Sequence, residues 1–193
     1  MNKRIYRLET PADYAAAESL TRAAFWNVYK PGCDEHYILH SLRGDPDAME
    51  SLNLVCEQGG RLIGHIFYTR ARIVDASGAA HPVLAFGPIS VHPDAQRTGV
   101  GSELIRRSLA LAGETDFGGV VITGNPAYYG RFGFRPASDF GVVLHDGSSF
   151  PELMALELRP GGLEGVSGRM HFSPRFFDVP ADGLEAFDAS FRS

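Results

Sequence analysis

The residues best able to do chemistry form a turn near the middle of the chain. It reads Val91-His92-Pro93-Asp94-Ala95-Gln96-Arg97-Thr98-Gly99-Val100-Gly101. The run before it, residues 83–91, is typical of a strand, and the run after it, residues 102–112, is typical of a helix. A turn in this place directs several backbone N–H groups at one point, where the helix dipole adds about half a positive charge. The turn therefore predicts an anion site suited to a diphosphate.

Two common nucleotide loops do not fit these letters. A P-loop requires Gly-x-x-x-x-Gly-Lys-Ser/Thr, and the chain contains no Lys-Ser or Lys-Thr pair. A dinucleotide fingerprint requires Gly or Ala where this chain has Leu104, and it occurs on an early turn instead of in mid-chain. The P-loop is excluded and the dinucleotide loop is disfavoured.

Two motifs in order carry a resemblance to a known family. Gln96-Arg97-Thr98-Gly99-Val100-Gly101 resembles the Gln/Arg-x-x-Gly-x-Gly/Ala signature of the GCN5-related N-acetyltransferases (GNAT). Further on, Asn125-Pro126-Ala127-Tyr128-Tyr129-Gly130-Arg131-Phe132-Gly133-Phe134 resembles that family's Asn…Ala…Tyr-x-x-x-Gly-Phe segment. Residues 84–136 are similar in detail to a subgroup of uncharacterised members, the YhbS-like predicted acetyltransferases. A looser similarity continues to residue 168.

The resemblance implies a fold, a domain organisation and a co-substrate. The fold class is α/β with a mixed α+β sheet: the GNAT-type acyl-CoA N-acyltransferase fold, a central mixed β-sheet flanked by helices. Residues 1–160 are expected to form the N-acetyltransferase domain, and residues 161–193 a C-terminal extension packed on it. The co-substrate implied is acetyl-CoA, with no metal.

In this family the glycine turn holds the pyrophosphate of acetyl-CoA. Glycine at Gly99 and Gly101 lets the backbone come close to the phosphates, where a Cβ would hold them off. The end of the preceding strand is expected to pair with the pantetheine amides and to supply an N–H for the oxyanion of the tetrahedral intermediate. The cofactor-binding residues so implied are Ile89, Ser90, Val91, Gln96, Arg97, Thr98, Gly99, Val100, Gly101, Ser102, Asn125 and Tyr129.

The resemblance also gives Tyr129 a catalytic role. A tyrosine hydroxyl has an ordinary pKa of about 10, so it is protonated at neutral pH and can donate to the leaving thiolate. The alternative is that Tyr128 and Tyr129 are half-buried aromatic residues on a short helix. Asn125 has two readings as well, since it could bind the cofactor or cap the helix that starts at Pro126.

The general base is not identified by the sequence. Glu35, His36, Glu57 and His65 are candidates, and loss of the amine proton to water is another possibility. Cys33 and Cys56 lie outside the motifs and show no Cys/His pairing at a recognisable spacing, so direct transfer is expected instead of an acyl-enzyme. His36 and His40 share a helix face but have no third ligand in view, which disfavours zinc.

Hydrophobic spacing and turn signals place these residues on alternating strands and helices. Tyr14, Leu20, Ala24 and Phe25 are expected to form the buried face of the first helix, and Phe25, Trp26 and Tyr29 to pack as core or lid or to line an acceptor pocket. The strands expected are residues 3–8, 52–57, 61–74, 81–91, 118–124 and 154–158, with another beginning at Phe134. The helices expected are residues 11–25, 34–42, 99–112 and 127–132, with irregular structure after residue 161 ending in a short helix near residues 184–191.

Composition narrows the function classes. The 193 residues carry a net charge of −5 at pH 7, which argues against a nucleic-acid surface, and they include no apolar run long enough for a membrane span. Arginines near the two motifs (Arg97, Arg106, Arg107 and Arg131) could form a local basic patch or solvated helix faces. Two cysteines and no signal-like start favour the cytoplasm.

The expected function is transfer of acetyl from acetyl-CoA to a primary amine. The acceptor is expected to be a small molecule, with a peptide amine as the alternative, and neither nucleic acid nor membrane is a partner. The rival from another class is a non-catalytic acyl-CoA sensor on the same fold. A longer acyl donor and a homodimer, which is common among GNAT proteins, stay open.

Overall fold

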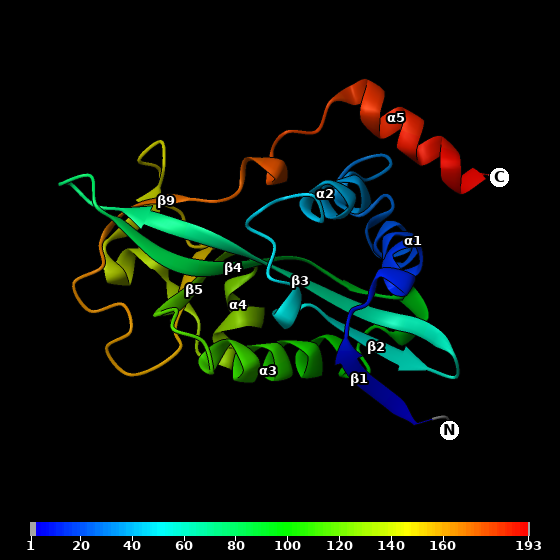
Figure 1. Ribbon diagram of the computed structural model, residues 1–193, viewed down its shortest axis with the longest axis horizontal. Helices are drawn as coiled ribbons and strands as arrows, with labels where there is room; N and C mark the ends of the chain where they lie inside the picture. Colours follow the sequence, from blue (N-terminus) through cyan, green and yellow to red (C-terminus); the bar gives the residue numbers. More distant parts are fainter. Residues whose placement is uncertain (1–2, 193) are drawn as a thin grey trace. The chain divides into compact units, whose positions relative to one another are not determined.

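The computed structural model describes residues 3–192, and the chain divides into two units. The first contains the chain up to Phe67, residues 87–108 and the segment from Pro174 onward. The second contains residues 68–86 and 109–173. Strands β3 (Arg61–Val74) and β4 (Ala80–Val91) and helix α3 (Val100–Gly113) each contribute residues to both units (Figure 1).

The first unit contains an antiparallel part of the sheet. Strand β1 (Arg4–Leu8) pairs with β2 (Leu54–Gln58), and β2 pairs with β3, so that Leu8, Leu54 and Ile66 lie in register. Beyond β3 lies β4, and just after its end the His92 N–H donates to the Ile63 carbonyl at 3.0 Å. The expected strands and the β2–β3 hairpin are therefore confirmed.

Helices cover both faces of this part of the sheet. Helices α1 (Tyr14–Phe25) and α2 (Glu35–Leu42) pack with Phe67 of β3 in one apolar cluster. Gly64, an odd number of residues away, points to the opposite face, where Val100 and Leu104 of α3 lie against it. Figure 1 shows α1 and α2 on one side of β1 to β3 and the start of α3 on the other.

The first helix begins as the sequence predicts. Residues Pro11–Asp13 form a 3-10 turn that leads into α1, and the carboxylate of Asp13 accepts from the Thr10 N–H at 2.8 Å and from its hydroxyl at 2.7 Å. Arg7 also donates to this carboxylate at 2.7 and 2.8 Å, and these bonds hold the pKa of Asp13 well below its usual range. This stabilisation is present above the ordinary carboxyl pKa of about 4 and is lost as the pH falls.

The buried face of α1 differs from the one expected. Leu20 is buried as predicted, but Tyr14, Ala24 and Phe25 are only half-buried. The buried positions are instead Ala17, Glu18, Leu20 and Thr21. The prediction was wrong there because it ranked positions by apolarity, whereas Glu18 and Thr21 are buried with polar partners.

The second unit contains the parallel pair of strands. Strand β5 (Gly119–Thr123) runs parallel to β4, with Leu84 opposite Val120, and antiparallel to β8 (Leu153–Glu157). A strand–helix–strand connection through α3 joins β4 to β5, as expected for a βαβ unit. The sheet is therefore mixed.

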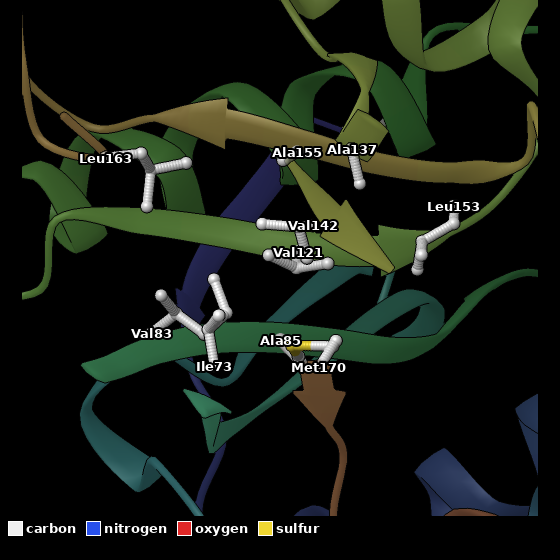
Figure 2. Packing of buried hydrophobic residues seen from close by; sticks show 10 residues of the cluster. All are labelled: Ile73, Val83, Ala85, Val121, Ala137, Val142, Leu153, Ala155, Leu163 and Met170. Atoms are coloured by element: carbon white, nitrogen blue, oxygen red, sulfur yellow. The ribbon is translucent and has the colours of Figure 1, made fainter. Parts of the chain in front are cut away.

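Ten buried residues form the core of the second unit (Figure 2). Val83 and Ala85 on β4, Val121 on β5 and Ala155 on β8 bring the central strands together. The remaining members of the cluster are Ile73, Ala137, Val142, Leu153, Leu163 and Met170.

Three short strands depart from the sequence prediction. The strand expected from Phe134 is reduced to β6 (Arg135–Pro136), which pairs with β8. Strands β7 (Val142–Leu144) and β9 (Gly168–His171) were not predicted, and β9 lies in the segment expected to be irregular. Strand β9 pairs with both β3 and β7, and of its four residues only Met170 is buried, so its sequence has almost no alternating pattern. The terminal helix α5 (Ala181–Ala189) starts earlier than expected.

None of the helices within residues 3–192 is long and apolar enough to cross a membrane.

The contact at Gly64 yields a prediction for stability. A Cβ on Gly64 would lie 2.6 Å from Val100 Cγ1 and 2.9 Å from Leu104 Cδ1, distances that real Cβ atoms do not tolerate. We expect Gly64→Ala to lower the free energy of unfolding by about 1–3 kcal/mol, because α3 must shift away from β3. Gly44→Ala is the control, since its Cβ would lie 3.7 Å from the Ser41 carbonyl oxygen. Equal denaturation midpoints for both variants would contradict the prediction.

Candidate active site

The glycine turn links β4 to α3 as the sequence predicts. Residues Pro93–Ala95 form a 3-10 turn, and α3 begins at Val100. Two residues of the turn have left-handed backbone, Arg97 with φ 60° and Gly99 with φ 90°. Left-handed residues interspersed in a turn bring successive N–H groups to the same side, which makes a concave anion site.

The start of α3 offers unused N–H groups to that site. The first bond of the helix runs from the Glu103 N–H to the Gly99 carbonyl at 3.0 Å, so the N–H groups of residues 99–102 precede the intrahelical ladder. Residues 96–99 are exposed. An anion can therefore reach donors that lie at the positive end of a long helix.

Arg4 on β1 holds this turn in place, a role that the sequence did not reveal. Its guanidinium donates to the Thr98 carbonyl at 2.8 Å and to the Thr98 hydroxyl at 2.7 Å. That hydroxyl in turn donates to the Ala95 carbonyl at 2.6 Å. An arginine far from the motif in sequence carries no local pattern, and only the adjacency of β1 to the turn exposes it.

The end of β4 lies next to the turn. The side-chain amide of Gln96 donates to the Val91 carbonyl at 3.2 Å, which fastens the turn to the strand. Ser90 is buried, and its hydroxyl donates to Thr21 of α1 at 2.8 Å. Ser90 and Val91 therefore lie next to the turn. Residues 89–91 can offer a ligand mainly their backbone N–H and C=O groups.

The second motif lies in the second unit. Helix α4 (Pro126–Tyr129) is capped by Asn125, whose side-chain oxygen accepts from the N–H of Ala127 at 2.9 Å and of Tyr128 at 3.3 Å. The capping interpretation of Asn125 is therefore confirmed. The amide nitrogen of the same side chain is not used in the cap.

Tyr129 is half-buried in an aromatic cluster. Its ring centroid lies 5.9 Å from those of Phe86 and Phe134 and 5.1 Å from that of Tyr128. A Cβ on Gly124 would lie 2.2 Å from the Tyr129 ring, so glycine there is required for the ring to occupy this position. These contacts fix the direction of the ring.

A known protein family matches most of the chain. A model of the Acetyltransferase (GNAT) family matches residues 5–134. The chain belongs to the GNAT family. The resemblance drawn from the two motifs is thereby confirmed.

Individual GNAT proteins agree over nearly the whole length. The chain is 25% identical over 173 residues to the uncharacterized N-acetyltransferase YhbS of Escherichia coli (strain K12), which covers 89% of this chain and 98% of YhbS. The crystal structure of E. coli YhbS in complex with CoA matches with a TM-score of 0.80 at 24% identity, covering 93% of this chain and 95% of that one. A GNAT family acetyltransferase from Brucella melitensis in complex with acetyl-CoA matches with a TM-score of 0.71 at 30% identity, covering 91% and 99%. The expected fold class is confirmed.

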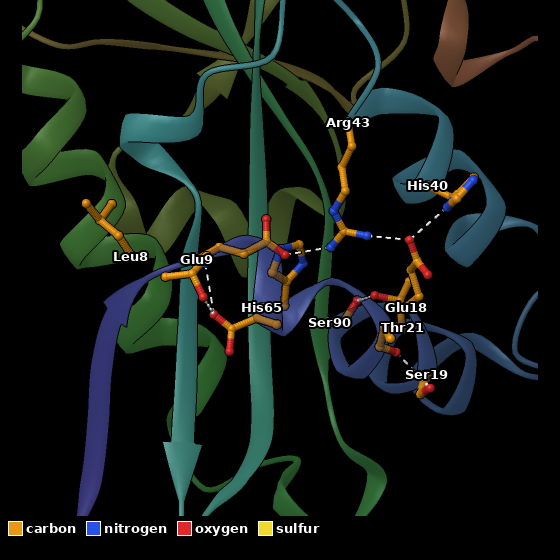
Figure 3. A network of polar contacts seen from close by, with 12 residues as sticks. Leu8, Glu9, Glu18, Ser19, Thr21, His40, Arg43, His65 and Ser90 are labelled. Atoms are coloured by element: carbon orange, nitrogen blue, oxygen red, sulfur yellow. Dashed lines mark hydrogen bonds and ion pairs between the residues drawn. The ribbon is translucent and has the colours of Figure 1, made fainter.

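The candidate bases of this GNAT protein have different surroundings. Glu57 accepts from Arg7 at 3.3 Å, which gives it a structural partner. Glu35 is half-buried, and burial raises its pKa. His65 is fully buried beside Glu9, whose oxygen lies 3.1 Å from its Nε2 (Figure 3).

His36 has a partner that the sequence did not predict. The Cys33 Sγ lies 3.4 Å from His36 Nδ1, so the expectation that neither cysteine pairs with a histidine was wrong. The spacing of three residues across the start of α2 brings them together. Burial raises the pKa of the Cys33 thiol to about 12, and burial lowers the pKa of His36. The pair is therefore a neutral thiol beside a neutral imidazole, and not an activated nucleophile.

The aromatic residues after α1 are not core. Trp26 is 38% exposed and Tyr29 is 78% exposed, and the Arg22 guanidinium lies 3.8 Å from the Trp26 ring centroid.

The arginines near the motifs have local partners: Arg107 donates to Glu103 at 2.7 Å, and Arg131 lies 4.5 Å from the Tyr128 ring centroid.

No group of three or more metal-binding side chains gathers among residues 3–192.

The Arg4 contacts yield a prediction for ligand binding. We expect Arg4→Ala to weaken CoA binding about tenfold, because the turn loses two charge-assisted hydrogen bonds that preorganise its N–H groups. Isothermal titration with CoA measures this. Arg106→Ala is the control, since it removes the same charge from a side chain that is 65% exposed on α3. Equal losses in both variants would mean that Arg4 acts through charge alone.

Proposed function

We propose that the chain transfers an acetyl group from acetyl-CoA to the primary amine of a small-molecule acceptor, by direct attack of the amine on the thioester. The observation that carries this is the turn before α3, where the N–H groups of residues 99–102 precede the first intrahelical bond, next to the exposed residues 96–99. Relatives support the cofactor: one GNAT structure of similar fold contains CoA and another contains acetyl-CoA.

In this proposal the turn binds the pyrophosphate. The backbone of Arg97, Thr98, Gly99, Val100, Gly101 and Ser102 would surround the phosphates, and Gln96 would keep the turn against β4. The backbone of Ile89, Ser90 and Val91 would pair with the pantetheine amides, because β4 continues to Val91 beyond its pairing with β5 at Leu84. An N–H in the same stretch would stabilise the oxyanion of the tetrahedral intermediate.

Tyr129 is the general acid of the proposed reaction. As the C–S bond breaks, its hydroxyl would protonate the leaving thiolate of CoA. The aromatic contacts to Phe86 and Phe134 support this role, because they hold the ring in one direction. The free amide nitrogen of Asn125 would donate to the cofactor while its oxygen caps α4.

The proposed acceptor is a small cationic amine. The net charge of −5 favours cations over anions near the surface. Direct transfer is supported by the neutral, buried state of the Cys33 thiol, which is a poor nucleophile for an acyl-enzyme.

A panel of amines tests the reaction. We expect purified protein to release free CoA from acetyl-CoA, detected as free thiol, with at least one of a polyamine, an aminoglycoside, an amino acid or a peptide N-terminus. Release should saturate with amine concentration. Tight acetyl-CoA binding with no release across the whole panel would instead support a non-catalytic acyl-CoA sensor.

Substitution of the general acid tests its role. We expect Tyr129→Phe to lower kcat about 100-fold while the Kd for acetyl-CoA rises less than about threefold, because the ring stays in place and the hydroxyl that protonates the thiolate is lost. Tyr128→Phe removes the neighbouring hydroxyl and should leave kcat within threefold. A kcat for Tyr129→Phe equal to that of the wild type would remove the tyrosine from the mechanism.

A further inference from the structure

One histidine in the middle of β3 has unsatisfied polar atoms. His65 is fully buried, yet neither of its ring nitrogens makes a well-aligned hydrogen bond within the described part of the chain. Its Nε2 lies 3.1 Å from Glu9 Oε1, so the distance suits a hydrogen bond but the direction does not. Catalytic hydrogen bonds often show such poor alignment before the ligand binds. An unpaired buried polar group costs about 1–3 kcal/mol, which makes this arrangement one to explain.

The carboxylate beside His65 is held ionised. Glu9 directly follows β1, its side chain is 3% exposed, and it accepts from Arg43 at 2.6 Å. Arg43 also donates to Glu18 at 2.5 Å, and Oε1 of Glu18 lies 3.0 Å from Nδ1 of His40 (Figure 3). Burial alone would raise the pKa of Glu9, but His65 and Arg43 outweigh it and hold that pKa below its ordinary value.

An ionised Glu9 determines the form of the neighbouring imidazole. A carboxylate can only accept, so the His65 nitrogen that faces it, Nε2, carries the proton. In a neutral ring the other nitrogen, Nδ1, then has a free lone pair. This is the arrangement by which a carboxylate orients a histidine base.

His65 lies across from the stretch of β4 assigned to the thioester. Strands β3 and β4 are neighbours in the sheet, and the His92 N–H donates to the Ile63 carbonyl at 3.0 Å. His65, two residues after Ile63, and Ser90, two residues before His92, therefore lie near each other on adjacent strands. Both side chains are on the face covered by α1, since Ser90 bonds Thr21 and Phe67 joins the α1 cluster. Figure 3 shows His65 and Ser90 on these adjacent strands. Such cross-strand neighbours have Cβ atoms about 4.5–5.5 Å apart.

Glu9 also lines a small cavity. The cavity has a volume of about 80 Å³, and the polar residues Tyr14, Arg43, Glu50 and Asn53 are among those that line it. A volume of this size holds several water molecules, because one needs only about 10–15 Å³. Because Glu9 is one of the residues that line this cavity, water there can solvate the carboxylate while it stays ionised.

We propose that His65 takes up the proton that the acceptor amine loses and returns it to solvent, and that the ionised Glu9 orients the imidazole for this relay. The inference rests on the proposed function, since it places the amine beside Ser90. Glu9 is a positioning residue: it fixes the tautomer of His65 and balances the charge of the imidazolium. Arg43, which bonds both Glu9 and Glu18, keeps Glu9 in place.

The proton balance of the step is complete. The ammonium group of the acceptor gives one proton to His65 Nδ1, and its lone pair then forms the C–N bond to the acetyl carbon. The C–S bond breaks and the thiolate takes a proton from the general acid, which regains the second proton of the amine. The overall products are the amide, CoA thiol and one proton, which the His65 imidazolium returns to solvent from Nδ1 as the products leave. The charged and titratable groups of the network that includes His65 are Glu9, Tyr14, Glu18, His40, Arg43 and Glu50.

The pH dependence of kcat/KM tests the relay. We expect the wild type to show a rising limb with pH, because Nδ1 must be unprotonated to accept. In Glu9→Gln the limb should move to lower pH, since a neutral amide no longer stabilises the imidazolium, and kcat should fall about tenfold. In His65→Gln the limb should disappear and kcat should fall about 100-fold, with the Kd for acetyl-CoA unchanged.

His40→Gln is the matched control. It belongs to the same network through Glu18 but is 54% exposed on its side chain, and it should keep both kcat and the pH limb of the wild type. Thermal melts and acetyl-CoA titrations identify any variant that does not fold. If His65→Gln is such a variant, the nearly isosteric Glu9→Gln carries the test.

A second readout does not require turnover. Nitrogen NMR of the full chain with labelled histidine should show His65 protonated at Nε2 and unprotonated at Nδ1. The His65 signals are assigned by the change they show in Glu9→Gln. The opposite tautomer would overturn the proposal. If CoA is released but the pH limb is the same in every variant, only the relay fails; if no amine releases CoA, the proposed transfer fails and the relay with it.

Discussion

The close packing of α3 on β3 at Gly64 is the constraint on which the proposed anion site depends. Because β3 has no side chain at this point, Val100 and Leu104 rest on the strand itself, and the first turn of α3 is held against the sheet. That position aims the N–H groups of residues 99–102 at the space beyond the turn. The helix dipole acts only near the end of a helix, so a small displacement of α3 would move the strongest part of its field away from a bound anion.

The buried ionic network on the other face of β3 has a different basis. Glu9, Arg43 and Glu18 have side chains that are at most 11% exposed. Taking such charges out of water costs several kcal/mol, and apolar residues of similar volume often serve stability equally well. Stability alone therefore does not account for the network. What apolar residues could not do is keep a carboxylate ionised beside His65.

The sequence predicted the parts of the molecule that have strong local patterns. The two long strands, the four main helices before residue 133 and the turn before Val100 follow from periodicity, capping residues and glycine positions. The short strands β7 and β9 were missed because strands of three and four residues, each with one buried side chain, show no period. The polar burial of Glu18 and Thr21 escaped because their partners, Arg43 and Ser90, are distant in the chain. The same reason hides the Arg4 contact to Thr98 and the approach of Glu9 to His65. Chemistry carried by residues that are close in the sequence can be predicted from the sequence. Contacts between segments that are distant in the chain can be identified only once the fold is known.

The attachment of Arg4 to Thr98 links the edge of the sheet to ligand binding. Strand β1 is the terminal strand of its sheet, and among residues 3–192 it pairs with β2 alone. Terminal strands are the first to open. Each opening of β1 also withdraws the guanidinium from the turn. By thermodynamic linkage, a ligand that binds only the intact turn must in return keep β1 closed. If the turn holds the cofactor as proposed, slowed amide hydrogen exchange in β1 would register occupancy of that site.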